Sequence, residues 1–190
     1  IDVVMRTTDR SGAPFAVWRT DYETYRAKSA NTARADNALH CLTVPRPDFA
    51  GLGISKPHLM GIVNVTPDSF SDGGVHYAAS DAVSGGLRMM AEGASFVDVG
   101  GESTRPGATP VEEQQEIARI VPVIEALARK QILISADTRR PDVMRSAVTA
   151  GALIINDVSG FRTESALSAA QEALALNPGR FGVIGMHMQG

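Results

Sequence analysis

The sequence has almost no cysteine and no long apolar run. Its only cysteine among 190 residues is Cys41, so an internal disulfide is excluded, and the neighbouring His40 does not by itself make a metal site. A reducing cytoplasm is therefore the expected compartment. No apolar run approaches the roughly 18 residues of a membrane-spanning helix, and this argues against a membrane protein.

A strong excess of one charge is also lacking. The formal net charge is −3 at pH 7 and the pI is about 5.8, which argues against nucleic acid or a membrane surface as a general partner. An anionic ligand must then be bound by local groups. The length of 190 residues and the hydrophobic content of 44% suit one sizeable globular core.

What the sequence does contain is a regular alternation of strand and helix from residue 58 onward. Five short, nearly continuous apolar runs predict strands that are buried on both faces, as in a parallel sheet. The runs are LMGIVNV (59–65), SFVDVG (95–100), ILISAD (132–137), ALIIND (152–157) and FGVIGM (181–186). The alternation predicts an α/β fold with right-handed parallel crossovers.

The helices between these runs have recognisable ends. Thr109, Pro110 and Glu112 predict the N-cap, the first residue and the capping-box acid of a helix that runs toward Lys130. Pro122 should kink or interrupt that helix. Three more helices are predicted at 80–93, at 141–151, which Pro141 opens and Gly151 closes, and at 163–176.

Polar residues follow every predicted strand. The segments are NVTPDSFSDGG, GGESTRPG, ADTRR, NDVSG and HMQG. Ligand sites of barrels and open α/β sheets lie at the carboxyl ends of strands. An open doubly wound sheet predicts one dominant glycine-rich turn, whereas five polar strand ends in succession favour a barrel. Residues 64–74 greatly exceed the about 2–6 residues that an α/β connection needs, so this loop is expected to bind a ligand.

Residues 1–55 do not share the alternation. The stretch 21–40 is compatible with a surface helix, and 45–57 is rich in turn-forming residues. We interpret 1–55 as an N-terminal extension of unassigned role and 56–190 as the barrel.

The polar segments together resemble those of a known family. GIVNVTPDSFSDGG (61–74) and DVGGESTRPGA (98–108), followed in order by SADTRRPDV (135–143), IINDVSG (154–160) and MHMQG (186–190), resemble the signature segments of dihydropteroate synthase. The resemblance covers about residues 56–190. It implies a TIM barrel that uses Mg²⁺ and condenses 6-hydroxymethyl-7,8-dihydropterin pyrophosphate with para-aminobenzoate. It also implies a sulfonamide target.

The resemblance implies pyrophosphate contacts at Asn64, Thr104 and Arg105, with Asn64 also contacting Mg²⁺. The chemistry agrees, because an arginine fork binds phosphate oxygens bidentately and an amide oxygen suits Mg²⁺. Asp72, in a glycine-hinged lid over the reacting carbon, would face the developing cation. Asp72, Asn64 and Arg105 are therefore the expected catalytic residues.

The organic substrates are assigned in the same way. The resemblance implies pterin contacts at Asp98, Asp137, Asn156 and Met186. A carboxylate accepts two parallel hydrogen bonds from the amino-pyrimidinone edge, and an amide pairs with the remaining donor and acceptor. Phe70 and Pro106, one from each long loop, would form apolar walls for para-aminobenzoate.

Several nearby polar residues have simpler interpretations. Asp157 is expected to cap the turn after its strand, and Glu102 is expected to hold its loop by hydrogen bonds. Arg139 and Arg140 resemble a basic pair at a helix start, and His187 is expected to be packed or capped.

A barrel of this type needs eight strands and about 250 residues, whereas five strands are predicted. The resemblance places a third pterin carboxylate, a bridging lysine and further anion contacts in segments beyond Gly190. We therefore expect a longer native polypeptide and no turnover by the 190 residues alone. A homodimer is left open, because the pairing surface of the family lies largely in those segments.

Two alternatives stay open at this point. One is another pterin-binding barrel of the methyltetrahydrofolate methyltransferase type, which would not need the paired TPDSFSDGG and ESTRPG loops. The other is a non-catalytic homologue that binds pterin or stabilises a partner enzyme, and an assay of catalysis beside pterin binding separates it. The expected partners are small-molecule substrates.

Overall fold

The computed structural model describes residues 2–8, 14–21, 23–24, 33–44, 47–66, 74–102 and 111–187. The chain divides into two compact units, Ile1–Arg46 and Pro47–Gly190. The division falls after residue 46, and residues 47–55 therefore belong with the second unit and not with the extension expected over 1–55.

The first unit contains an antiparallel hairpin and a helix. β1 (Asp2–Thr8) pairs with β2 (Pro14–Asp21), with Met5 opposite Trp18. α2 (Ala33–Thr43) follows. The hairpin was not expected, although β1 contains two Val and two Thr, β2 contains Phe, Val, Trp and Thr, and a Ser-Gly pair lies between them. The helix lies later than the expected 21–40, of which residues 22 and 25–32 lie outside the described part.

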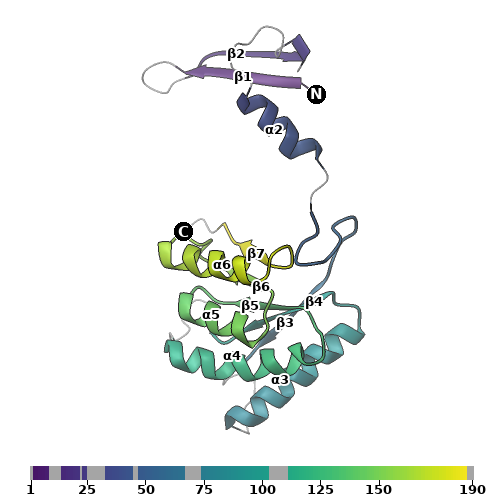
Figure 1. Cartoon of the computed structure of the whole chain (residues 1–190), viewed down its shortest axis with the longest axis vertical. Helices are drawn as coiled ribbons and strands as arrows, with labels where there is room; N and C mark the ends of the chain where they lie inside the picture. Colours follow the sequence, from purple (N-terminus) through teal and green to yellow (C-terminus); the bar gives the residue numbers. More distant parts are fainter. Residues whose placement is uncertain are drawn as a thin grey trace. The chain divides into compact units, whose positions relative to one another are not determined.

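The second unit contains five parallel strands in the order of the chain. They are β3 (Met60–Asn64), β4 (Phe96–Gly100), β5 (Ile134–Asp137), β6 (Ile154–Asp157) and β7 (Gly182–Gly185). The connecting helices are α3 (Gly74–Ala91), α4 (Glu113–Ala128), α5 (Pro141–Ala150) and α6 (Glu164–Leu176). Figure 1 shows these helices following one another in chain order alongside the sheet. This is the arrangement of a (β/α)₈ barrel, and the predicted α/β fold with five barrel strands is confirmed.

The core lies between the strands and the helices. Val97 and Val99 of β4 and Ile134 of β5 are fully buried there with Ile124 and Leu127 of α4. Because side chains alternate along a strand, the intervening residues of β4 and β5, which include Asp98 and Asp137, face the opposite side of the sheet. This inner side corresponds to the barrel interior and carries the polar strand ends.

Residues 47–58 cover the amino-terminal end of this inner side. Phe49 and Leu52 exchange backbone hydrogen bonds of 2.8 Å and pack with Ala50 in one cluster with Phe96 and Ile154. These last two residues are the first of β4 and β6. From the sequence only the turn-rich composition of this stretch was noted, and most of it was placed in the extension, whereas its apolar side chains close one end of the barrel segment.

The helix ends follow the predictions in part. Gly151 ends α5 with a φ of 114°, as predicted, and Thr163 caps α6 by accepting a hydrogen bond from the Ala166 N–H at 3.2 Å. The predicted start of α4 was wrong. Glu112 occupies its N-cap without a side-chain cap, and Thr109 and Pro110 lie outside the described residues.

Two further helix predictions need correction. α4 continues through Pro122, so the predicted interruption at this exposed proline does not occur. α3 begins at Gly74 rather than near residue 80. Among the helices that the structure describes, none is long and apolar enough to cross a membrane.

Candidate active site

The predicted site residues form one row across four strands. In the sheet register, Asn64 of β3 pairs with Gly100 of β4, Gly100 with Asp137 of β5, and Asp137 with Asn156 of β6. A Cβ on Gly100 would lie 3.3 Å from Asp137 Oδ2 and 3.7 Å from Asn64 Oδ1. The amide of Asn64 and the carboxylate of Asp137 therefore flank a strand position that has no side chain of its own.

Asp98 lies one row deeper and fixes the orientation of Asn156. The Asn156 Nδ2 group donates a hydrogen bond of 3.0 Å to Asp98 Oδ2, and the Asp98 side chain is buried. The amide nitrogen thus faces Asp98, the orientation that an ionised carboxylate requires because it only accepts hydrogen bonds. Asp98 Oδ1 and the neighbouring Ser135 Oγ are buried without a hydrogen-bond partner among the described residues.

The carboxyl groups of Asp98 and Asp137 both have raised pKa values. Burial is the main cause at Asp137 and, with the negative charges of Asp98, Glu116, Asp157 and Glu102, raises its pKa to about 7. Burial also raises the pKa of Asp98, against the opposing effect of the Ser135 and Asn156 side chains. The inner end of the sheet therefore holds a carboxyl group that changes charge near neutral pH.

Met186 and Asp157 lie at the carboxyl end of the last described strands. Met186 directly follows β7, donates its backbone N–H to the Asp157 carbonyl at 3.1 Å and has a partly exposed side chain. The Asp157 carboxylate accepts hydrogen bonds from the Ser159 N–H and the Phe161 N–H at 2.7 and 2.8 Å. The prediction that Asp157 caps its turn is confirmed.

The remaining predicted site residues lie outside the described part of the chain. They are Phe70, Asp72, Thr104, Arg105 and Pro106. The structure thus brings together Asn64, Asp98, Asp137 and Asn156.

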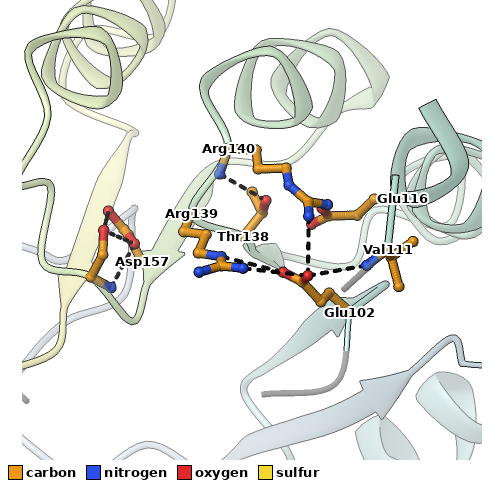
Figure 2. Close-up of polar contacts among 8 residues, drawn as sticks. Glu102, Val111, Glu116, Thr138, Arg139, Arg140 and Asp157 are labelled. Atoms are coloured by element: carbon orange, nitrogen blue, oxygen red, sulfur yellow. Dashed lines mark hydrogen bonds and ion pairs between the residues drawn. The ribbon is translucent and has the colours of Figure 1, made fainter. Parts of the chain in front are cut away.

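Glu102 was predicted to hold the second long loop by hydrogen bonds, and it does bind the backbone on the far side of that loop. Glu102 Oε1 accepts a hydrogen bond from the Val111 N–H at 3.3 Å, and the carboxylate also contacts Arg139 and Arg140 (Figure 2). The contribution of the buried Glu116, which binds Arg140, was not predicted. No motif in the sequence indicates a contact between these separate helices.

Comparisons with known proteins agree with this geometry. Residues 60–190 match the family model of pterin-binding enzymes. Dihydropteroate synthase of Escherichia coli (strain K12) is 49% identical over 140 residues, which are 73% of this chain and 48% of that protein. The chain spans about half the length of the curated relatives it matches.

Solved structures give the same result. Dihydropteroate synthase of Xanthomonas albilineans with 4-aminobenzoic acid is 51% identical with a TM-score of 0.68, covering 78% of this chain and 53% of that one. Dihydropteroate synthase of Burkholderia cenocepacia complexed with 7,8-dihydropteroate is 44% identical with a TM-score of 0.61, covering 73% and 44%.

Proposed function

The chain belongs to the pterin-binding enzyme family, and we propose that it is the N-terminal part of a dihydropteroate synthase. The reaction would join 6-hydroxymethyl-7,8-dihydropterin pyrophosphate and para-aminobenzoate into 7,8-dihydropteroate and release pyrophosphate. The row of Asn64, Asp137 and Asn156 along the carboxyl ends of neighbouring strands carries this proposal. The compartment we propose is the cytoplasm, on the basis of the single cysteine.

In this proposal Asp137 and Asn156 bind the pterin. The ionised Asp137 carboxylate accepts hydrogen bonds from the amino-pyrimidinone edge. Asn156 has its nitrogen directed to Asp98, which leaves Oδ1 to accept from a further ring N–H. Asp98 acts through Asn156, and Met186 covers the ring from the side of β7.

The pyrophosphate would be bound at the β3 end of the row, by Asn64 and by residues that follow β4. Arg105 and Thr104 donate to the phosphate oxygens, and Asn64 supplies one amide oxygen to Mg²⁺. Asn64 fits this role because it is exposed at its strand end, and Mg²⁺ keeps several waters and takes its remaining ligands from substrate phosphates. No cluster of three His, Cys, Asp or Glu that could hold a metal exists among the described residues. The bound ion would neutralise charge on the leaving group.

The chemical step is a substitution at the methylene carbon. The bond to the pyrophosphate oxygen breaks, and its electron pair leaves with the pyrophosphate. The amine nitrogen of para-aminobenzoate, held between Phe70 and Pro106, forms the new C–N bond and then loses a proton to solvent. Asp72 stabilises the cation that develops between these events.

The test uses the polypeptide that contains this chain together with any sequence that continues it. We expect pyrophosphate release that depends on both Mg²⁺ and para-aminobenzoate. Asp72→Ala should lower kcat by about 100-fold or more while titration calorimetry shows nearly unchanged pterin binding.

Other outcomes identify the alternatives. Pterin binding without any turnover would contradict the proposal and indicate a non-catalytic homologue. Equal loss of turnover and pterin binding in Asp72→Ala would assign the loop a binding role.

A further inference from the structure

An ionic cluster joins three elements at the base of residues 103–110. Its members are Glu102 after β4, Glu116 on α4, and Arg139 and Arg140 before α5 (Figure 2). Glu102 is the last described residue before 103–110. Its Oε1 accepts a hydrogen bond from the N–H of Val111, the first described residue after them. The carboxylate of Glu102 therefore links the two residues that flank the segment 103–110. We call these two residues, Glu102 and Val111, the stem.

Arg140, the N-cap residue of α5, binds the carboxylate of Glu102. Its Nη2 donates to Glu102 Oε1 at 3.0 Å, and its Nη1 donates to Glu116 Oε2 at 2.5 Å. The side chains of Glu102, Glu116 and Arg140 are 10%, 1% and 20% exposed. An arginine fork can bind two carboxylates at once, whereas a lysine offers a single charged nitrogen. Because the three side chains are largely shielded from water, breaking one of these ion pairs should cost more free energy than breaking a surface pair.

The backbone around this cluster is also fixed. Arg119 Nη1 donates to the Gly101 carbonyl at 2.8 Å, and a Cβ on Gly101 would lie 2.9 Å from Ile120 Cγ2. The backbone before Glu102 therefore lies directly on α4, with no room for a side chain.

The stem is also connected to the row of strand ends. The Arg140 N–H donates to Thr138 Oγ1 at 3.2 Å, and the Thr138 N–H donates to the Asn156 carbonyl at 3.0 Å. Asn156 and Glu102 are therefore joined through Thr138 and Arg140.

We infer that Arg140 is a positioning residue that acts through Glu102 to fix the stem of residues 103–110. This segment carries Thr104, Arg105 and Pro106, so the consequence for catalysis rests on the proposed function. Arg140 is not required to touch a substrate. Its loss should misplace the anion and aminobenzoate contacts while leaving pterin binding intact.

The experiment compares Arg140→Lys with Arg145→Lys in the polypeptide that contains the whole chain. Arg145 is a matched control within α5, the helix that follows Arg140, because it binds Glu172 at 2.8 and 3.1 Å and Asp142 at 2.9 Å in exposed contacts that involve neither Glu102 nor Glu116. We expect Arg140→Lys to raise the KM for para-aminobenzoate about tenfold, the loss of one charged hydrogen bond, with pterin affinity within twofold. Arg145→Lys should change neither.

A second readout does not depend on catalysis. Hydrogen exchange of the Val111 amide should accelerate about tenfold in Arg140→Lys and not in Arg145→Lys. Glu102→Gln keeps an acceptor for Val111 but loses the charge, so it provides a second variant. In the double variant Glu102→Gln/Arg140→Lys, the KM and the Val111 exchange rate should rise no further than in the more affected single variant. The reason is that both substitutions disrupt the same Glu102–Arg140 interaction.

The inference is overturned if Arg140→Lys leaves both the KM and the Val111 exchange within twofold of wild type, or if Arg145→Lys shifts them equally. Absence of turnover in the wild type would refute the proposed function only, since the exchange comparison still decides the role of Arg140.

Discussion

At the scale of single residues, the ionisation of Asp137 links pterin binding to pH. Burial and neighbouring carboxylates raise its pKa to about 7, and the proposed hydrogen bonds require the ionised form. Below pH 7 the affinity for a pterin should fall about tenfold per pH unit, because a proton must first be removed. Calorimetric titration of a pterin between pH 5 and 9 measures this, and a flat profile would contradict it.

The same pKa makes a prediction about stability. The folded protein holds the Asp137 proton more tightly than the unfolded chain, so the free energy of unfolding should fall as pH rises from about 4 to about 7. Asp137→Asn should remove this pH dependence of the free energy of unfolding and be at least as stable as wild type at pH 8. The same substitution should weaken pterin binding about 100-fold. Urea titrations at pH 5 and 8 test the stability difference, and Asp137→Asn less stable than wild type at pH 8 would refute it.

At the scale of elements, α3 tolerates two adjacent glycines for different reasons. A Cβ on Gly85 would meet no atom within 4 Å, whereas a Cβ on Gly86 would lie 3.3 Å from Leu127 Cδ2 and 3.6 Å from Val97 Cγ1. Both of these neighbours are fully buried. Gly85 therefore destabilises the helix through the backbone entropy that it loses on folding and has no packing role. Gly86, in contrast, allows α3 to approach α4 and the sheet.

Alanine substitution should separate these two roles. We expect Gly85→Ala to stabilise the protein by about 0.5–1 kcal/mol. Gly86→Ala should lack this gain and be less stable than Gly85→Ala by about 1–3 kcal/mol, because its methyl group crowds a filled core. Chemical denaturation of both variants gives the comparison, and equal gains would show that α3 is not closely packed at this point.

The elements also show what a sequence can predict. The five strands were located because they are uninterrupted apolar runs with polar ends, and their register then aligns Asn64, Asp137 and Asn156 without further information. The role of Arg140 was missed, because its partners Glu102 and Glu116 lie 38 and 24 residues away. The packing of Phe49 and Leu52 against Phe96 and Ile154 leaves no periodic pattern in the sequence, and the turn-rich composition of 45–57 therefore gave no sign of it.

At the scale of the whole molecule, the described sheet has two edges, β3 and β7. Apolar side chains are exposed on both, with Ile62 at 56% and Val183 at 49%. Neighbouring strands and helices would cover such residues in a closed eight-stranded barrel. This exposure supports the proposal that the chain works as part of a larger enzyme.

The two compact units predict how the molecule responds to shortening. A variant that begins at Pro47 lacks the first unit but keeps Phe49, Ala50 and Leu52 on the inner side of the sheet. A variant that begins at Lys56 lacks these residues and the Gly53 carbonyl that contacts His58 Nε2 at 2.8 Å. We expect the first variant to retain the unfolding free energy of the pterin-binding unit.

The second variant should lose about 3 kcal/mol, comparable to truncating a large core side chain, because Phe96 and Ile154 become exposed. Thermal and urea unfolding of both variants, each with any sequence that follows Gly190, provide the measurement. Equal stability would mean that residues 47–55 belong with the extension, whereas a loss confined to the shorter protein would place the start of the barrel unit at Pro47.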